Sequence, residues 1–448
     1  MVFHLKYGNY ISIAFFIVQI LSVLASLARI PCRMRGPHTA MTFRPGMTSA
    51  RMILFLLLAL GSHESKAAGA NAPAEIVLGI SAPFAGAAED LGKNMQRGIV
   101  AGLERANRCG GVNGRNLRLI ALDDGYEPAR TAPNMRQLIG KDNVLAVIGN
   151  VGTPTAIVAV PIANEQKTLL FAAYSGGPVL RNNPPDRYVI NFRASYAEEI
   201  AAMLDALIDT AGFKPDEIAF FTQRDTYGDA GFALAMTALQ RHGLKDPKTV
   251  LHVDYERNSL AVEGAVAKLL MAEKPPRAVV MIGAYAPSAK FIRICRASDL
   301  SPLFLSVSFV GSGPFADALG KIDAHIIVTQ VVPYPLDDTL PIAREYQADL
   351  KIMDPSASAG FGDLEGYIAA RILTLALDKI QGPVTRETVV DGLDGLGEFD
   401  IGLGESLYLS RTEHQASHRV WPTVFKDGGF VPFQWRDITA LSTGDAPP

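Results

Sequence analysis

Short apolar runs alternate with helical patterns along most of this chain, and no other feature constrains the fold as strongly. The runs at residues 75–81 and 117–124 are typical of buried strands. Between them, Leu91, Met95 and Ile99 fall on one face at helical spacing. Strands that alternate with helices of this length form parallel sheets covered on both faces. We therefore predict an α/β protein.

The alternation restarts after residue 193, which predicts two Rossmann-like lobes rather than one. Ser195 and Glu198 have the spacing of a capping box and open the next helix. Further strands are expected at residues 217–223, 249–255, 278–285, 303–308 and 326–333. We assign residues 71–193 with 329–398 to the first lobe, 194–328 with 399–435 to the second, and 436–448 to a tail.

Residues 1–70 have the character of a targeting region. An apolar stretch at residues 52–60 follows Arg51, and the small residues Ala68-Gly69-Ala70 come later. That order is typical of a secretory signal peptide, which can be read from Met47 and would leave a mature start close to Asn71. The alternative is a membrane anchor formed by residues 11–28, which have about the length of a transmembrane span.

Charge and cysteine usage narrow the function. The first 70 residues contain seven of the 42 basic residues and one of the 45 acids, so the rest of the chain carries a net charge of −9. A basic footprint is missing, and we predict no nucleic-acid partner. The cysteines show no metal-ligand spacing, and Cys109 and Cys295 could be free or bridged.

The segment at residues 144–160 has the pattern of a strand, a glycine turn and a helix start, which can bind a small ligand. An apolar run crosses Gly149-Asn150-Val151-Gly152 and continues as a second apolar run after Thr153-Pro154. Thr153 is a good N-cap and Pro154 a good first helical residue. A helix N-terminus with free N–H groups suits a carboxylate. The alternative is an ordinary strand-to-helix turn, and Pro161 should kink or interrupt the helix.

Ligands of open parallel sheets lie beyond the carboxyl ends of the strands. The residues expected there are hydroxyls, aromatics and one exposed backbone position: Phe84, Thr153, Ala173, Ser175, Tyr227, Tyr285 and Ser308. They contain no nucleophile–base pair. The dinucleotide fingerprint, the P-loop and the nucleophile elbow are missing as well. We therefore predict a binding protein without a cofactor or metal, and not an enzyme.

Other polar residues have plainer interpretations. Asp123 and Asp124 could hold a metal, but a solvated pair at a strand end is the favoured interpretation. His414 and His418 have a spacing of four but lack the metalloprotease order, so structural hydrogen bonding is expected. Tyr227 could simply pack, and the same alternative holds for Tyr285.

Residues 75–435 resemble the periplasmic Leu/Ile/Val-binding proteins, the type I solute-binding components of ABC importers. The matching stretches are APFAGAAEDLGKNMQRGIVAGLERAN, GGVNGRNLRLIALDDGYEP, VIGNVGTPTA, RDTYGDAGF and FKDGGFVPF. The resemblance implies two lobes joined by three crossovers, a periplasmic monomer, a small-molecule ligand and an ABC permease as partner. The division into two lobes predicts that the ligand closes the cleft by a hinge near Arg193 and residues 328–333.

Carried over by position, the resemblance gives roles to single residues. The contacts of the family with the ligand carboxylate fall on Thr153 and Ser175, with the backbone of Ala173 nearby, and those of the second lobe fall on Tyr227 and Tyr285. The disulfide positions of the family fall on Tyr126 and Gly152, so that bridge is absent.

Ser308 departs from the family, because it aligns with the acid that neutralises the ligand's ammonium group in the amino-acid binders. A buried ammonium without a counter-charge is costly. The sequence therefore favours a small carboxylate, amide or aromatic acid over a zwitterionic amino acid, without naming the ligand. Delivery to an importer is the leading function. A receptor of the same fold that signals to a membrane partner is the alternative.

Overall fold

The structure is a computed structural model that describes residues 75–443. The predicted signal peptide and the alternative anchor lie outside the described residues. No helix in the described part of the chain combines the length and the apolar character needed to cross a membrane.

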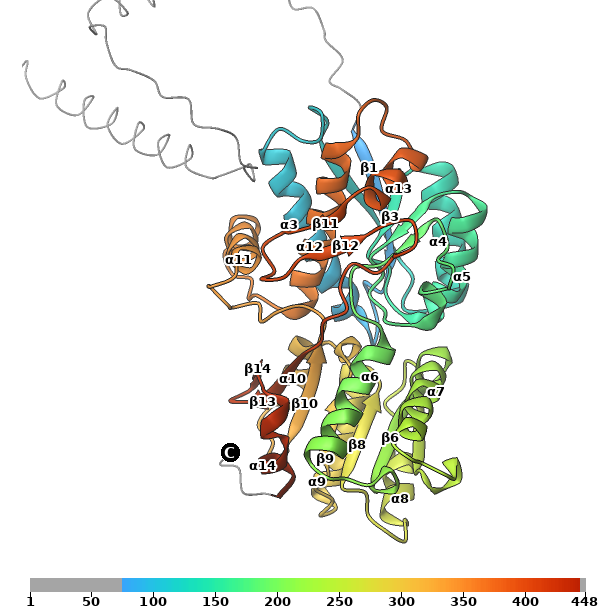
Figure 1. The fold of residues 1–448 in the computed structure, drawn as a ribbon, viewed down its shortest axis with the longest axis vertical. Helices are drawn as coiled ribbons and strands as arrows, with labels where there is room; N and C mark the ends of the chain where they lie inside the picture. The colour runs from blue at the N-terminus through green and yellow to red at the C-terminus, as the bar shows by residue number, and fades with distance from the viewer. Residues whose placement is uncertain (1–74, 444–448) are drawn as a thin grey trace, which may run out of the picture. The chain divides into compact units, whose positions relative to one another are not determined.

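The first lobe is built on a five-stranded parallel sheet with the order β2-β1-β3-β4-β5 (Figure 1). Its strands are β1 (Ile76–Ala82), β2 (Leu117–Asp123), β3 (Ala146–Ile148), β4 (Leu169–Phe171) and β5 (Val189–Ile190). Its helices are α3 (Glu89–Arg108), α4 (Pro128–Arg136), α5 (Thr153–Glu165), α11 (Pro341–Met353), α12 (Phe361–Lys379) and α13 (Arg386–Asp394).

Alternate residues of these strands enter two separate cores. Ala146 and Ile148 pack in the cluster that holds α3 and α12, whereas Val147 packs in the cluster that holds α4 and α5. Successive side chains of a strand point to opposite faces of a sheet, so an uninterrupted apolar run is needed where both faces are buried. This explains why the apolar runs of the sequence predict these strands.

The second lobe is built on a seven-stranded sheet with the order β14-β13-β10-β9-β8-β6-β7. Its strands are β6 (Ile218–Arg224), β7 (His252–Glu256), β8 (Ala278–Ile282), β9 (Leu303–Ser306), β10 (Ile326–Gln330), β13 (Trp421–Lys426) and β14 (Gly429–Pro432). Its helices are α6 (Tyr196–Asp205), α7 (Thr226–Arg241), α8 (Glu263–Leu270), α9 (Tyr285–Ala297), α10 (Ser312–Leu319) and α14 (Ile438–Thr443). The strands β6 to β10 are parallel, and β13 and β14 are antiparallel. The predicted α/β fold is confirmed.

Short elements complete the chain. A hairpin is formed by β11 (Gly397–Phe399) and β12 (Leu407–Leu409). Single turns of 3-10 helix lie at Pro178–Leu180, Pro215–Glu217, Pro247–Thr249, Ser308–Val310 and Trp435–Asp437, and π-helical turns extend α4 at Gln137–Lys141 and α6 at Ala206–Thr210. Cys295 is a buried free thiol, so no bridge joins it to Cys109.

The chain passes between the lobes three times. The first two crossings are residues 191–195, between β5 and α6, and residues 331–340, between β10 and α11. The third comes at residues 418–420, because Asn191 still forms a bridge with Gln415 beside the first lobe. That is later than the predicted boundary at residue 399. The short hairpin carries no long apolar pattern that could have located the crossing.

Candidate functional site

Thr153 and Ser175 meet where two neighbouring strands of the first lobe end. Their hydroxyl oxygens lie 2.8 Å apart, and Thr153 is 2% and Ser175 0% exposed. Thr153 is the first residue of α5, and Gly152 (φ +102°) precedes it. The prediction that Thr153 is the N-cap is therefore wrong by one residue, and its hydroxyl binds Ser175 instead of its own helix.

Gly152 is required at this turn for two reasons. Its positive φ favours glycine, and a Cβ atom there would lie 2.2 Å from the ring of Tyr126. Tyr126 and Gly152 are thus in direct contact. The helix α5 continues past Pro161 to Glu165, so the predicted interruption does not occur. Ile157, whose carbonyl loses its partner at this proline, is exposed to water.

Ser175 is held by its own loop. Its hydroxyl accepts a hydrogen bond from the backbone N–H of Gly177 at 3.1 Å, and its N–H donates to the carbonyl of Ala173 at 2.7 Å. Arg181 donates to the carbonyl of Ser175 at 3.2 Å. Ala173 is buried beside it. Three of the predicted residues therefore form one preorganised corner of polar atoms on the first lobe.

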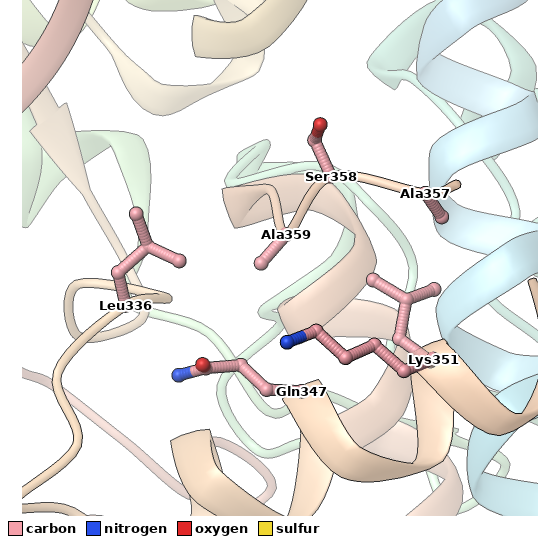
Figure 2. A pocket seen from close by; sticks show the side chains of 7 residues that line it. Leu336, Gln347, Lys351, Ala357, Ser358 and Ala359 are labelled. Atoms are coloured by element: carbon pink, nitrogen blue, oxygen red, sulfur yellow. The ribbon is translucent and has the colours of Figure 1, made fainter. Parts of the chain in front are cut away.

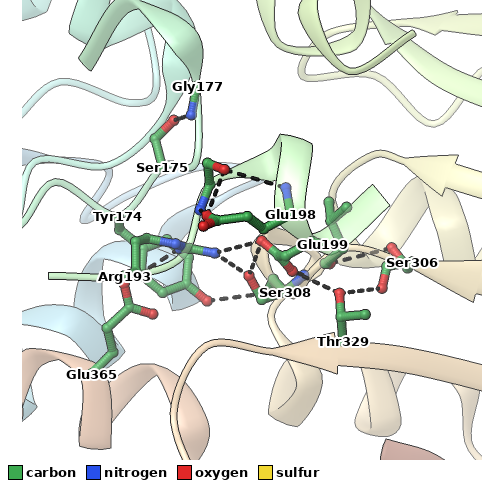
Figure 3. Close-up of polar contacts among 12 residues, drawn as sticks. Tyr174, Ser175, Gly177, Arg193, Glu198, Glu199, Ser306, Ser308, Thr329 and Glu365 are labelled. Atoms are coloured by element: carbon green, nitrogen blue, oxygen red, sulfur yellow. Dashed lines mark hydrogen bonds and ion pairs between the residues drawn. The ribbon is translucent and has the colours of Figure 1, made fainter. Parts of the chain in front are cut away.

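Ser308 of the second lobe lies in a buried network of charged and polar side chains (Figure 3). Its hydroxyl donates to Glu199 Oε1 at 3.0 Å, and its N–H donates to Glu199 Oε2 at 2.7 Å. Arg193 donates to the Ser308 hydroxyl, and Thr329 donates to Glu199 Oε2 at 2.6 Å. Arg193 also pairs with Glu199 at 3.2 Å and with Glu365 at 3.3 Å. We call these five residues the hinge network.

The hinge network changes the interpretation of Ser308. A carboxylate is present beside this neutral residue, supplied by Glu199 of α6, but its oxygens are used by Arg193, Ser308 and Thr329. Burial by itself would lower the pKa of Arg193, yet the carboxylates of Glu365 and Glu199 outweigh it and raise that pKa. Burial raises the pKa of Glu365 to about 7.

The sequence places Arg193 at the expected hinge, but it does not point to Glu199 or Glu365 as functional residues. The signal for Arg193 is its position where the chain crosses between the lobes. Glu199 follows the residue that closes the capping box, and Glu365 stands on α12, 172 residues after Arg193. No local pattern predicts that these three side chains meet.

The predicted tyrosines take different positions. Tyr227, the second residue of α7, is fully buried, with its ring 4.7 Å from that of Phe309 and 5.3 Å from that of Tyr196. The Tyr227 hydroxyl has no hydrogen-bond partner within residues 75–443. Tyr285 begins α9, and burial and the carboxylate of Asp90 on α3 raise its pKa. Tyr285 therefore lies between the lobes.

Phe84 is partly buried against the core that contains α3. Its described polar contact is made by the backbone, whose N–H donates to Asp123 Oδ1 at 2.8 Å. The structure gives Phe84 no polar or ring contact with the other predicted residues.

The strand-end aspartates have structural roles. Asp124 is buried and accepts hydrogen bonds from Ser81 at 2.8 Å, from the N–H of Tyr126 at 2.9 Å and from Thr131 at 3.0 Å. The prediction of a solvated pair is therefore wrong for Asp124, because its loop folds back over it. Asp123 pairs with Arg130 at 2.5 Å.

The histidines make the structural hydrogen bonds that the sequence predicts. His414 bonds to the carbonyl of Val189 at 2.9 Å and to Asp394 at 3.1 Å. His418 bonds to Glu198 at 2.6 Å.

A separate cavity of about 280 Å³ lies within the first lobe, between α11 and the loops beside it (Figure 2). Its lining residues are Leu336, Gln347, Leu350, Lys351, Ala357, Ser358 and Ala359. None of them is a predicted site residue, and the amide of Gln347 is used by the carbonyl of Pro335 at 3.0 Å. Binding sites combine an apolar pocket with converging polar groups. This cavity offers few, so we do not assign the ligand to it.

The amino-acid sequence of this chain is similar to those of known proteins. A family model described as periplasmic binding protein matches residues 75–429. The Leu/Ile/Val-binding protein homolog 7 of Brucella abortus is 25% identical over 351 residues, which cover 73% of this chain and 82% of that protein.

Solved structures agree with that match. The structure of a possible leucine/isoleucine/valine-binding protein from Rhodopirellula baltica is 45% identical, with a TM-score of 0.80, and the match covers 83% of this chain and 99% of that chain. A substrate-binding periplasmic protein from Ralstonia solanacearum is 26% identical, with a TM-score of 0.72 and coverage of 80% and 99%.

Proposed function

We propose that this chain, which belongs to the family of periplasmic binding proteins, captures a small carboxylate, amide or amino-acid-like ligand and delivers it to an ABC importer. The family consists of solute-binding proteins that bind small molecules in the periplasm. The observation that carries the proposal is the buried pair of Thr153 and Ser175 hydroxyls at the N-terminus of α5.

The chemistry of this pair suits a carboxylate or carbonyl oxygen. The first N–H groups of a helix lack partners within the helix, and the helix dipole favours negative charge there. One hydroxyl donates to the other, so the proton of the second is free to point toward an acceptor, and either residue can take either role. The Tyr227 hydroxyl, which has no hydrogen-bond partner among the residues that the structure describes, offers a further donor from the second lobe.

The groups around Ser308 bear on whether the ligand carries an ammonium group, as an amino acid does, or lacks one. Ser308 brings no charge of its own, and the carboxylate of Glu199 beside it is used by protein groups. That arrangement supports a ligand without an ammonium group. The similarity to a possible leucine/isoleucine/valine-binding protein from Rhodopirellula baltica supports the opposite choice, an amino acid with an ammonium group. We therefore propose both as candidates, with the uncharged or acidic ligand preferred.

Calorimetry with leucine, its keto acid and its amide tests the proposal. We expect the keto acid or the amide to bind more tightly than leucine. Thr153→Ala should weaken binding by about 1–3 kcal/mol, the cost of leaving a buried polar partner unpaired. Thr237→Ala on the exposed face of α7, whose hydroxyl bonds within its own helix, is the matched control.

Tight binding of leucine would reverse the preference between ligands. No heat with any of the three, together with no small molecule in mass spectra of the purified protein, would contradict solute capture.

We also propose export to the periplasm by the predicted signal peptide, with a mature start close to Asn71, and function as a monomer without enzymatic activity. N-terminal sequencing of the secreted protein is the check. A retained segment at residues 11–28 would support the membrane anchor instead.

A further inference from the structure

A turn at residues 125–127 of the first lobe reaches directly to the second lobe. Gly125 (φ +56°) and Tyr126 (φ +63°) both have left-handed backbone conformations. For a bulky residue such as Tyr126 this conformation is unusual and is held by its surroundings. The Tyr126 ring lies against Gly152, and the Asp124 side chain binds the N–H of Tyr126. The turn therefore fixes the direction in which Glu127 leaves the first lobe.

The carboxylate of Glu127 makes its described hydrogen bonds across the lobes. Oε2 accepts from Arg257 Nη2 at 2.6 Å, and Oε1 accepts from Asn258 Nδ2 at 2.6 Å. Arg257 and Asn258 follow β7 of the second lobe, and Asn258 also has a left-handed backbone (φ +58°). Both oxygens of one carboxylate are thus bound by neighbouring residues of the opposite lobe.

Tyr126 connects the same turn to the candidate site. Its ring covers Gly152, the residue before Thr153. Its hydroxyl accepts a hydrogen bond from Gln223 Nε2 of the second lobe at 3.3 Å, and its ring lies 5.9 Å from that of Phe309. A change in the spacing of the lobes at Glu127 would therefore alter the packing of Tyr126 against Gly152, next to the helix N-terminus that carries Thr153.

We propose that Glu127, Arg257 and Asn258 form a latch that holds the two lobes closed, and that these three are positioning residues for ligand capture. This inference rests on the proposed function, because closure serves a binding protein. The side chains of Arg257 and Glu127 are 24% and 39% exposed, so water and salt compete for the latch. A contact of this kind can form and break as the lobes move, since its charges need not be buried unpaired at any stage.

Small-angle scattering of the periplasmic protein, freed of bound ligand by partial unfolding and dialysis, tests the latch. Glu127→Gln removes the charge, and we expect the ratio of closed to open molecules to fall by about threefold to fivefold. Asn258→Asp is isosteric and tolerates the same backbone conformation, but it places a second carboxylate opposite Glu127. It should open the protein further, and more at about 0.01 M than at about 1 M salt, because salt screens the repulsion.

The combination of Glu127→Gln with Asn258→Asp supplies the rescue, because it restores a hydrogen bond without two facing charges. Asp254→Asn is the control, since the pair of Arg224 with Asp254 also spans 2.6 Å but lies within the second lobe. Unchanged scattering of both single variants, no rescue in the double variant, or equal opening of the control would each overturn the latch. The measurement uses no ligand, so a failed calorimetry panel would contradict the proposed function and leave the latch standing.

Discussion

Two sets of charged contacts join the same two lobes, and they differ in burial. The hinge network places Arg193, 1% exposed, between Glu199 of the second lobe and Glu365 of the first. The latch pairs Glu127 with Arg257 across the lobes, and their side chains are 39% and 24% exposed. Burial, more than distance, therefore decides whether a contact can be released during function.

The energetics of the two sets follow from their surroundings. A buried charge that loses its partner keeps its desolvation cost, so removing one partner destabilises the fold strongly. An exposed pair can exchange its partner for water and contributes about 0–1 kcal/mol. The hinge network should therefore stay intact in every state of the folded protein, whereas the latch can open.

The largest expected effect comes from breaking the hinge network. Arg193→Met keeps a long apolar stem but leaves Glu199 and Glu365 buried without their cation. We expect the free energy of unfolding to fall by about 3–5 kcal/mol. Urea denaturation measures it. Arg118→Met, which removes an exposed pair with Glu75, is the control and should change the free energy by under about 1 kcal/mol. Equal effects of the two variants would show that burial does not separate these contacts.

Much of the fold follows from the sequence for simple reasons. Apolar runs that must bury both faces of a sheet are hard to mistake, and the predicted strands appear in the structure. The meeting of Thr153 and Ser175 follows as well, because parallel strands that are neighbours end at the same edge.

The charged contacts could not be predicted in the same way. Glu365 comes from α12, which is far along the chain from Arg193, and the packing of α12 against α3 in the first lobe fixes its position. The latch depends on left-handed turns at Tyr126 and Asn258, residue types that give no turn signal as strong as glycine does. The contact of Ser308 with Glu199 gives no local signal either, because 109 residues separate them.

A smaller effect concerns pH and the second acid of the hinge network. Burial raises the pKa of Glu365 from 4.5 to about 7, so the folded protein binds a proton that the unfolded chain releases. Stability from this group is therefore present below pH 4.5 and is lost as the pH rises toward 7. As the pH rises from 4.5 to 7, the free energy of unfolding of Glu365→Gln, taken relative to that of the wild type, should increase by up to about 3 kcal/mol. Urea denaturation at a series of pH values measures the gain.

The comparison within each pH removes the contribution of other acids. Asp363, whose pKa is raised to about 6 chiefly by burial, titrates in both proteins and cancels. A difference between variant and wild type that does not change with pH would show that Glu365 titrates as an exposed acid does.

The smallest expected effect distinguishes the influence of burial from that of position in the fold. It concerns the pair of His418 and Glu198, which lies at the crossings but is exposed. His418, beside the third crossing, binds Glu198 at the start of α6 at 2.6 Å, and its side chain is 58% exposed. The hydrogen bond to Glu198 raises the pKa of His418 above 6.5. The pKa of Glu198 is lowered to about 2, because hydrogen bonds from His418 and Ser195 outweigh its burial.

The stabilisation by the pair of His418 and Glu198 is therefore complete between pH 4.5 and 6.5. It is lost at lower pH as Glu198 gains a proton and at higher pH as His418 loses one. His418→Gln should lower the free energy of unfolding by under about 1 kcal/mol in that window and by less at higher pH, as urea denaturation at both would measure. If burial decides how much a charged contact stabilises the protein, the loss in the free energy of unfolding should be small, as expected for an exposed pair. A loss as large as that of Arg193→Met would mean that position at the crossings matters more than burial.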